Sequence, residues 1–230
     1  MKKSVYLVLT ALLCASCFHV NTNFKGIGGM NTVKGEGPVI SKSFDLKDFD
    51  AIVINGHADA VFTQSSTYEV TLSTQENIFD HVDIRVDGST LVIETKDKVN
   101  IRAEKYDFVL QAPVLKSLTV NGASDFNIPS GLRTEGDLKI EVNGAGDLTF
   151  NQIECNTLSV QANGASDIDA DSLKVHSMSI LVNGAGDVRL SGTTESASFE
   201  VNGAGDIDAR NLRVAGEVKR HTAGMAKIRF

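Results

Sequence analysis

The chain has 230 residues, of which 42% are hydrophobic, and it carries a formal net charge of −7. This hydrophobic content supports a continuous core and excludes a disordered chain, and the acidic balance argues against a nucleic-acid partner. The 20 glycines, 3 prolines and absence of tryptophan are typical of a β-rich chain with many corners.

The first 16 residues resemble the signal peptide of a bacterial lipoprotein. Lys2 and Lys3 precede an apolar stretch, residues 5–13, which is too short to cross a bilayer, and small residues then lead to Cys17. We therefore expect cleavage after residue 16 and a lipid on Cys17 that anchors the chain in a membrane. The pattern departs from the common one at Cys14, where such signals usually have leucine. The alternative is an ordinary secretory signal.

Residues 17–37 follow the signal and are polar and glycine-bearing, so we expect a flexible tether there. Once the signal is removed, Cys17 and Cys155 are the remaining cysteines. A lipidated Cys17 leaves Cys155 without a partner, so the sequence predicts no disulfide framework.

Residues 38–230 are predicted to form one domain, whose first part, residues 38–112, consists of irregular β-strands. The segment "VDGSTLVI" at 86–93 has Asp-Gly between alternating apolar residues, which predicts a hairpin. This part is expected to be either a separate antiparallel cap or the early coils of a solenoid. It contains "NGHAD" at 55–59, which begins 66 residues before Asn121. Because 66 is three times 22, that interval is compatible with three intervening units that have lost the motif.

Residues 113–230 contain a repeated pentapeptide. "NGASD" occupies 121–125 and 163–167, and "NGAGD" occupies 143–147, 183–187 and 202–206, so the asparagines recur at intervals of 22, 20, 20 and 19 residues. Apolar residues stand three and one positions before each asparagine and five and seven positions after it. Spacing by two on both sides of a glycine-rich break predicts strand, corner and strand. The sequence therefore predicts a β-solenoid with coils of about 20 residues.

Each residue type in the motif suits a corner between strands. We expect the glycines to turn the chain, the asparagines to form a ladder of hydrogen bonds from coil to coil, and the aspartates to accept hydrogen bonds from backbone N–H groups. The corner residues predicted in this way are Asn121, Gly122, Asp125, Asn143, Gly144, Asp147, Asn163, Gly164, Asp167, Asn183, Gly184, Asp187, Asn202, Gly203 and Asp206.

The aspartates of the motif raise a second possibility. Stacked at ~5 Å, adjacent carboxylates repel by on the order of 1 kcal/mol in water, and either hydrogen bonds or a cation must offset that. Calcium accepts such oxygen ligands. The candidate ligands are Asp125, Asp147, Asp167, Asp187 and Asp206. However, the nonapeptide calcium repeat has another period and another glycine–aspartate spacing, so we favour a structural corner without a bound metal.

Catalytic arrangements are hard to find in this sequence. The five histidines fall at unrelated phases of the repeat, and no nucleophile motif or metal-spaced cluster accompanies them. Asp167 and Asp169 could act as paired carboxylates in a polysaccharide-acting enzyme, but the chain lacks the aromatic residues on which sugar rings stack. We therefore expect no catalytic residues, no enzyme activity and no cofactor.

The final ten residues, "HTAGMAKIRF" at 221–230, are a worn copy of the repeat. Aligned on the motif, His221, Thr222 and Met225 stand where Asn, Gly and Asp would. We expect an atypical last coil there.

Several of these features occur together in a known family. The segment "FDAIVINGHADAVFTQSSTYEVTLSTQENIFDHVDIRVDGSTLVIETKDK" at 49–98, followed by "VLQAPVLKSLTVNGASDFNI" at 109–128 and the NGAGD coils, resembles the putative auto-transporter adhesin, head GIN domain family. The resemblance covers roughly residues 40–230. It implies an exported, right-handed β-helical or β-solenoid fold, frequent in lipoproteins of Bacteroidetes-type bacteria. It implies no activity and no ligand residues.

Together these observations predict a non-enzymatic, adhesin-like or structural interaction module, lipid-anchored in the outer membrane of a Gram-negative bacterium. It would face either the periplasm or the cell surface, and the lack of an acidic run after Cys17 favours the periplasmic side. We expect a protein or glycan partner that the sequence does not identify, and homo-oligomer formation is open. The alternatives are a calcium-binding solenoid and a polysaccharide-acting enzyme.

Overall fold

The computed structural model of this protein describes residues 31–230. The predicted signal peptide, the predicted lipidation site Cys17 and most of the predicted tether lie outside these residues. Within the described part, almost every element is a strand, and the two helices are short 3₁₀ turns, η1 (Glu76–His81) and η2 (Lys96–Lys98). Neither turn is long or apolar enough to cross a membrane.

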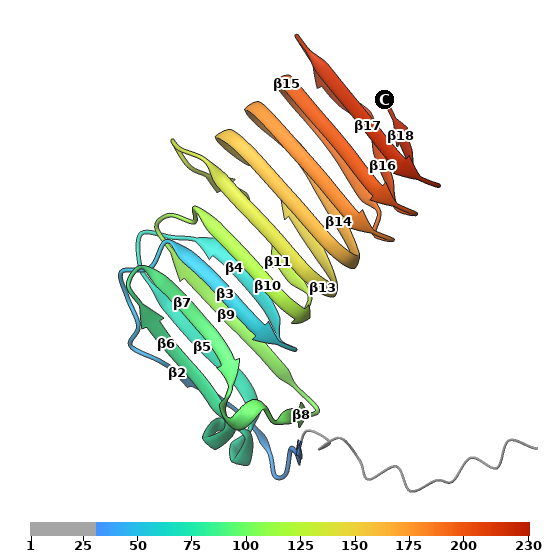
Figure 1. Ribbon diagram of the computed structural model, residues 1–230. Coiled ribbons are helices and arrows are strands. Elements are labelled where there is room, and N and C mark those ends of the chain that lie inside the picture. Colours follow the sequence, from blue (N-terminus) through green and yellow to red (C-terminus); the bar gives the residue numbers. More distant parts are fainter. Residues whose placement is uncertain (1–30) are drawn as a thin grey trace, which may run out of the picture. The chain divides into compact units, whose positions relative to one another are not determined.

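The predicted β-solenoid is confirmed, and its coils have three sides. The first side is a parallel sheet in the order β7 (Thr90–Thr95), β3 (Ala51–Gly56), β10 (Ser117–Ala123), β13 (Leu138–Asn151), β14 (Ile153–Gly184), β15 (Val188–Gly203) and β17 (Val218–Gly224). Strands β13 to β15 are long because they run around corners and contribute to more than one side. Figure 1 shows these strands stacked side by side from the β2 and β6 end to β17 and β18.

The second side follows the motif in each coil. Its parallel strands run in the order β9 (Tyr106–Ala112), β4 (Asp59–Gln64), β11 (Phe126–Ile128), then the later parts of β13, β14 and β15, then β16 (Asp206–Val214) and β18 (Lys227–Arg229). The third side is shorter. It contains β12 (Leu132–Arg133) beside β14, followed by parts of β15 and β16.

The motif is in register from coil to coil. Asn121 pairs with Asn55 on one side and with Asn143 on the other, and Asn183 pairs with Asn202. The apolar positions flanking the motif consequently stack inside the coils, where they are at most 3% exposed at the positions three before and five after the asparagine. Each fully buried aliphatic side chain of this kind contributes about 1.5–3 kcal/mol, so the stack of inward positions supplies most of the favourable free energy of folding.

The interpretation of the 66-residue interval before Asn121 was wrong. The coil that carries Asn55 lies directly beside the coil that carries Asn121, with no coil between them. The chain leaves the stack after β4, builds the end of the molecule with residues 65–112, and returns to stack β10 on the free side of β3. Strand order in space, β7–β3–β10, therefore differs from strand order in sequence.

The excursion forms an antiparallel cap over the first coil. Strand β5 (Glu69–Gln75) is antiparallel to β9, and β2 (Val39–Ser43) is antiparallel to β5. On the other sheet, β6 (Val82–Asp87) forms the expected hairpin with β7. Residues 38–112 thus contain both a true coil and a cap. Residues 32–34, placed in the tether by the sequence, form β1 (Thr32–Lys34), which pairs with β8 (Asn100–Arg102).

Candidate functional site

The asparagines of the motif form a continuous ladder of side-chain hydrogen bonds. Each Nδ2 donates to the Oδ1 of the asparagine in the preceding coil, at 2.8–3.0 Å. The members are Asn55, Asn121, Asn143, Asn163, Asn183 and Asn202. An amide suits this position because it is both donor and acceptor, so a column of identical side chains satisfies itself. At the capped end, Asn55 donates to Glu94 at 3.1 Å.

The first glycine of the motif is required by the close approach of neighbouring coils. Gly184 has a φ of +151°, which L side chains rarely adopt, and a Cβ there would overlap the carbonyl oxygen of Gly164. The same overlap occurs at every corner from Gly122 to Gly224, whereas a Cβ on Gly56, at the capped end, would meet no atom within 4 Å. Glycine is therefore a condition for stacking as well as for turning the chain.

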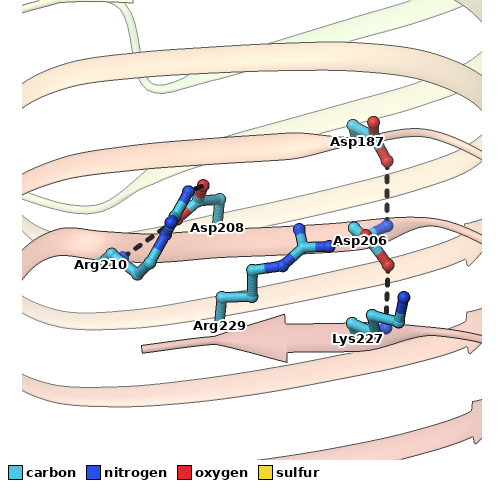
Figure 2. Close-up of polar contacts among 6 residues, drawn as sticks. All are labelled: Asp187, Asp206, Asp208, Arg210, Lys227 and Arg229. Carbon is cyan, nitrogen blue, oxygen red and sulfur yellow. Dashed lines mark hydrogen bonds and ion pairs between the residues drawn. The ribbon is translucent and has the colours of Figure 1, made fainter.

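The aspartates accept backbone hydrogen bonds from the coil that follows. In five carboxylates of the column, Oδ1 takes the N–H of the residue at the same position in the next coil, at 3.0–3.3 Å. The acceptors are Asp59, Asp125, Asp167, Asp187 and Asp206, and the donor after Asp206 is Lys227. Figure 2 shows the run from Asp187 through Asp206 to Lys227. These hydrogen bonds join neighbouring coils and oppose the repulsion within the column.

Basic side chains accompany the later part of the aspartate column. Arg189 lies in register between Asp169 and Asp208 and pairs with Asp169 at 3.1 Å. Asp208 is held instead by Arg210, whose hydrogen bonds lower the pKa of that carboxyl to about 2. Arg229 pairs with Asp206 at 2.9 Å (Figure 2).

The earlier part of this side is a shallow acidic hollow of about 360 Å³. Its lining includes Asp59, Asp107, Asp125 and Asp147. Within residues 31–230, however, no three or more His, Cys, Asp or Glu side chains are placed together to hold a metal ion. The carboxylates of the column are spread one per coil, and Asp59 and Asp125 each turn one oxygen to the next coil's backbone. The structure therefore gives the calcium hypothesis no converging ligand set.

The residues considered for catalysis are engaged in structural contacts. Asp167 accepts the N–H of Asp187 at 3.0 Å, and Asp169 is paired with Arg189. Cys155 is a free, buried thiol, and burial raises its pKa to about 11, so it is held as the neutral thiol. It lies at the floor of a hollow of about 660 Å³ on the third side of the solenoid, whose lining also includes Lys174 and Glu195.

The alignment of the last repeat was wrong by two residues. Asn202 pairs with Ala223, Gly203 with Gly224 and Asp206 with Lys227. The position of Asn is therefore taken by Ala223, and that of Asp by Lys227. Gly224 keeps the positive φ of the motif glycine, at +103°, so the glycine is what marks the corner. Its presence at 224 was the signal in the sequence that could have corrected the alignment.

The corrected register also places two polar residues of the last coil at inward positions, which was not predicted from the sequence. Arg220 pairs with Phe199, and Thr222 pairs with Val201, so both occupy inward positions that are apolar in the preceding coils. The equivalents of Arg220 are Leu118, Ile140, Val160, Ile180 and Phe199, each at most 3% exposed. Arg220 and Thr222 are exposed because β17 ends the described stack.

Comparison with known proteins identifies the family. The family model described as "Putative auto-transporter adhesin, head GIN domain" matches residues 48–230. The chain belongs to this family. The resemblance found in the sequence is thereby confirmed, and the name indicates a bacterial envelope or surface protein. No curated protein matches the chain.

Solved structures share the fold of this head GIN domain. A putative adhesin from Bacteroides fragilis NCTC 9343 is 21% identical with a TM-score of 0.72, over 86% of this chain and 99% of that one. A putative adhesin from Parabacteroides distasonis ATCC 8503 is 22% identical with a TM-score of 0.74, over 86% of this chain and 84% of that one. A putative lipid binding protein from Parabacteroides distasonis ATCC 8503 is 18% identical with a TM-score of 0.60, over 86% of this chain and 99% of that one.

Proposed function

We propose that this head GIN domain is a non-enzymatic binding module of adhesin type, held at the cell envelope by a lipid on Cys17. The proposal rests on one observation, which is that the polar groups of the motif bind to one another and to the backbone between coils. Its asparagine amides and aspartate carboxylates are hydrogen-bonded between coils, so the repeat builds a rigid stack and supplies no converging reactive groups. Recognition then falls to the outward side chains and to the ends of the stack.

The neutral state of Cys155 and the contacts of Asp167 and Asp169 support a role without catalysis. A thiol with a raised pKa is a poor nucleophile at neutral pH. Asp167 and Asp169 are already engaged, with the backbone N–H of Asp187 and with Arg189, and these contacts hold neighbouring coils together.

The anchored location rests on the signal-like residues 1–16 and on Cys17, together with the envelope character of the family. We place the protein at the outer membrane of a Gram-negative bacterium. Mass spectrometry of the membrane fraction should find a diacylated or triacylated N-terminal Cys17, and Cys17→Ala should move the protein to the soluble fraction. A soluble wild-type protein with a free N-terminus would contradict the anchor.

The binding role is tested separately from the anchor. Cells that display the protein should lose adhesion to the host or bacterial surface that they bind when the gene is deleted, and should recover it with the wild-type chain. Added protease should remove the protein from intact cells if it acts at the surface. Full protection from protease, with unchanged adhesion after deletion, would overturn the adhesin role. Turnover of a glycan panel would overturn the non-enzymatic role.

A further inference from the structure

The end of the stack formed by β17 and β18 differs from the rest of the molecule in charge. Residues 217–230 carry four basic side chains, Lys219, Arg220, Lys227 and Arg229, against one acidic side chain, Glu217. Their net charge is +3, whereas the whole chain carries −7. A basic end on an acidic solenoid attracts acidic partners and orients them toward that end.

The same end is an open sheet edge within the described residues. Strand β17 pairs with β15 alone, and β18 pairs with β16 alone, so each has one side without a partner strand. Six of the seven residues of β17 are exposed. Such an edge presents a row of backbone donors and acceptors that an extended chain can pair with. Met225, 83% exposed, and Phe230, 48% exposed, add apolar surface beside it.

Arg220 makes this edge selective. It stands at the inward position of β17, directly over the column that Phe199 ends, and it has no carboxylate partner among residues 31–230. A second copy that stacked a coil or its own cap here would bury the unpaired guanidinium against apolar side chains, which is strongly unfavourable. A strand with a carboxylate opposite Arg220 would avoid that cost and gain a charge-assisted hydrogen bond.

Lys227 extends the basic surface around the corner. Its backbone N–H is used by Asp206, and its side chain has no carboxylate partner in the described structure. Lys219 is exposed and only loosely paired with Glu217, at 3.4 Å. Lys219 and Arg220 are consecutive in β17 and point to opposite faces, and Lys227 lies beyond the corner in β18, so acidic residues on either face of an incoming strand find a basic partner.

We propose that the edge of β17 and β18 binds an extended, acidic polypeptide segment of another protein by strand addition. Backbone hydrogen bonds of the edge would supply affinity, and Arg220, Lys219 and Lys227 would select glutamate or aspartate in the incoming strand. The inference rests on the proposed binding function and names its site. The edge also lies at the opposite end of the stack from β8, the partner of β1 (Figure 1). Strand β17 is roughly 35 Å from β7, so a partner at this edge would not meet the cap.

The test uses the full chain in detergent and a labelled ten-residue peptide of threonine and glutamate, with the glutamates in adjacent pairs so that they occur on both faces of a strand. Fluorescence anisotropy should detect binding that weakens with added salt. The double variant R220E/K227E should bind the peptide at least about tenfold more weakly. The matched control K174E reverses an exposed charge on the third side and should leave the affinity unchanged. A thermal melt of each variant verifies that it is folded.

A proline-containing peptide separates strand addition from unspecific charge attraction. A peptide of equal charge with proline at alternate positions should bind at least about tenfold more weakly, because it lacks the backbone donors. Equal binding of the proline peptide, or an equal loss in K174E, would overturn the proposal and show that charge alone drives the binding. Absence of any binding to the threonine–glutamate peptide would show that the basic edge only protects the end of the stack.

Other occupants are distinguished in parallel. Sedimentation of the wild-type chain should show a monomer, and a concentration-dependent dimer that R220E disrupts would assign the edge to a second copy. Vesicles containing anionic lipid should not compete with the peptide, and strong competition would assign the edge to a membrane. Because these measurements need neither acylated Cys17 nor living cells, a failure here leaves the proposed anchor and adhesin role standing.

Discussion

Of the residues of the motif, the first glycine is the one that can least be replaced. Asparagine and aspartate join neighbouring coils, but they could be exchanged for other polar side chains at a cost of a few hydrogen bonds. Gly184 has no such substitute, because its φ is positive and the space for a Cβ is already filled by the carbonyl of Gly164. The corner at Ala223–Gly224 shows the same order of importance, since the asparagine is lost there and the glycine is kept.

Substitution of Gly184 by alanine tests this constraint. We expect Gly184→Ala to lower the free energy of unfolding by about 3–5 kcal/mol, because it adds backbone strain to a steric overlap with the adjacent coil. Urea denaturation followed by circular dichroism measures the change. Gly136→Ala is the control, because its Cβ would meet no atom within 4 Å and its φ is not in the left-handed region. Equal effects of the two changes would contradict a steric constraint at Gly184.

The asparagine ladder can be tested in its middle. Asn163 donates to Asn143 and accepts from Asn183, both at 2.8 Å, and it also accepts from Gln161 at 3.3 Å. Asn163→Ala therefore removes three hydrogen bonds and leaves both ladder neighbours with an unmet group. We expect a loss of about 2–3 kcal/mol in the free energy of unfolding, measured in urea. Asn127→Ala, at an exposed position outside the ladder, should change stability by less than about 0.5 kcal/mol. A neutral Asn163→Ala would show that water replaces the ladder at no cost.

At the scale of elements, the two ends of the stack are protected by different means. The first end is covered by antiparallel pairing. Strand β2 is antiparallel to β5, β5 is antiparallel to β9, and β6 forms an antiparallel hairpin with β7. The other end keeps the solenoid geometry in β17 but places Arg220 and Thr222 at inward positions. A charged residue at an inward position makes the stacking of a further coil unfavourable, and it does so without covering strands of the kind found at the first end.

Removal of that charge should promote self-association. Arg220→Val completes an apolar inward column at an open edge, so we expect dimers or larger species that increase with protein concentration in sedimentation velocity. Lys219→Val is the matched control, since it adds the same side chain to the outward face of the same strand. If both variants remained monomeric, inward Arg220 would not be what prevents stacking.

The sequence could predict the elements around the motif but not the path of the chain through the cap. Apolar spacing on both sides of Asn143 or Asn183 fixes strand, corner and strand, because only one side of each strand can face the core. The hairpin at 86–93 was likewise local and predictable. No local sequence pattern indicates that residues 65–112 leave the stack and return. The Asp-Gly turn predicts a hairpin, but it does not specify at which end of the sheet that hairpin packs. The third-side hollow also has no motif, because its walls are single residues from successive coils.

At the scale of the whole molecule, the charged carboxyl groups make the stability of the fold depend on pH. Several carboxyl groups are engaged in hydrogen bonds and ion pairs in their ionised form, in the cap and in the coils. The pKa of Glu94 is lowered by hydrogen bonds from Arg85 and then Asn55, that of Glu141 by Asn143 and then Lys139, and that of Asp50 by Lys116. Glu94 also accepts the hydrogen bond of Asn55, so it ends the asparagine ladder at the cap.

These lowered pKa values predict loss of stability in acid. A carboxyl group with a folded pKa below its unfolded value of about 4 is protonated first in the unfolded chain. Its contribution is therefore complete above about pH 5 and is lost as the pH falls through the folded pKa. Urea denaturation from pH 7 to pH 3 should show a falling free energy of unfolding. Glu94→Gln should be less stable than wild type at pH 7, and the difference should shrink toward pH 3; a constant difference would contradict the assignment.

Both ladders run in one direction, and this has a consequence for how the chain is assembled. In each pair of coils, the later coil brings the donor, an amide or a backbone N–H, and the earlier coil already holds the oxygen that accepts it. A polypeptide that crosses a membrane from its N-terminus would complete the cap first and would then offer each new turn a finished template. Growth of the solenoid in that order resembles the elongation of a polymer from a fixed seed, with the cap as the seed.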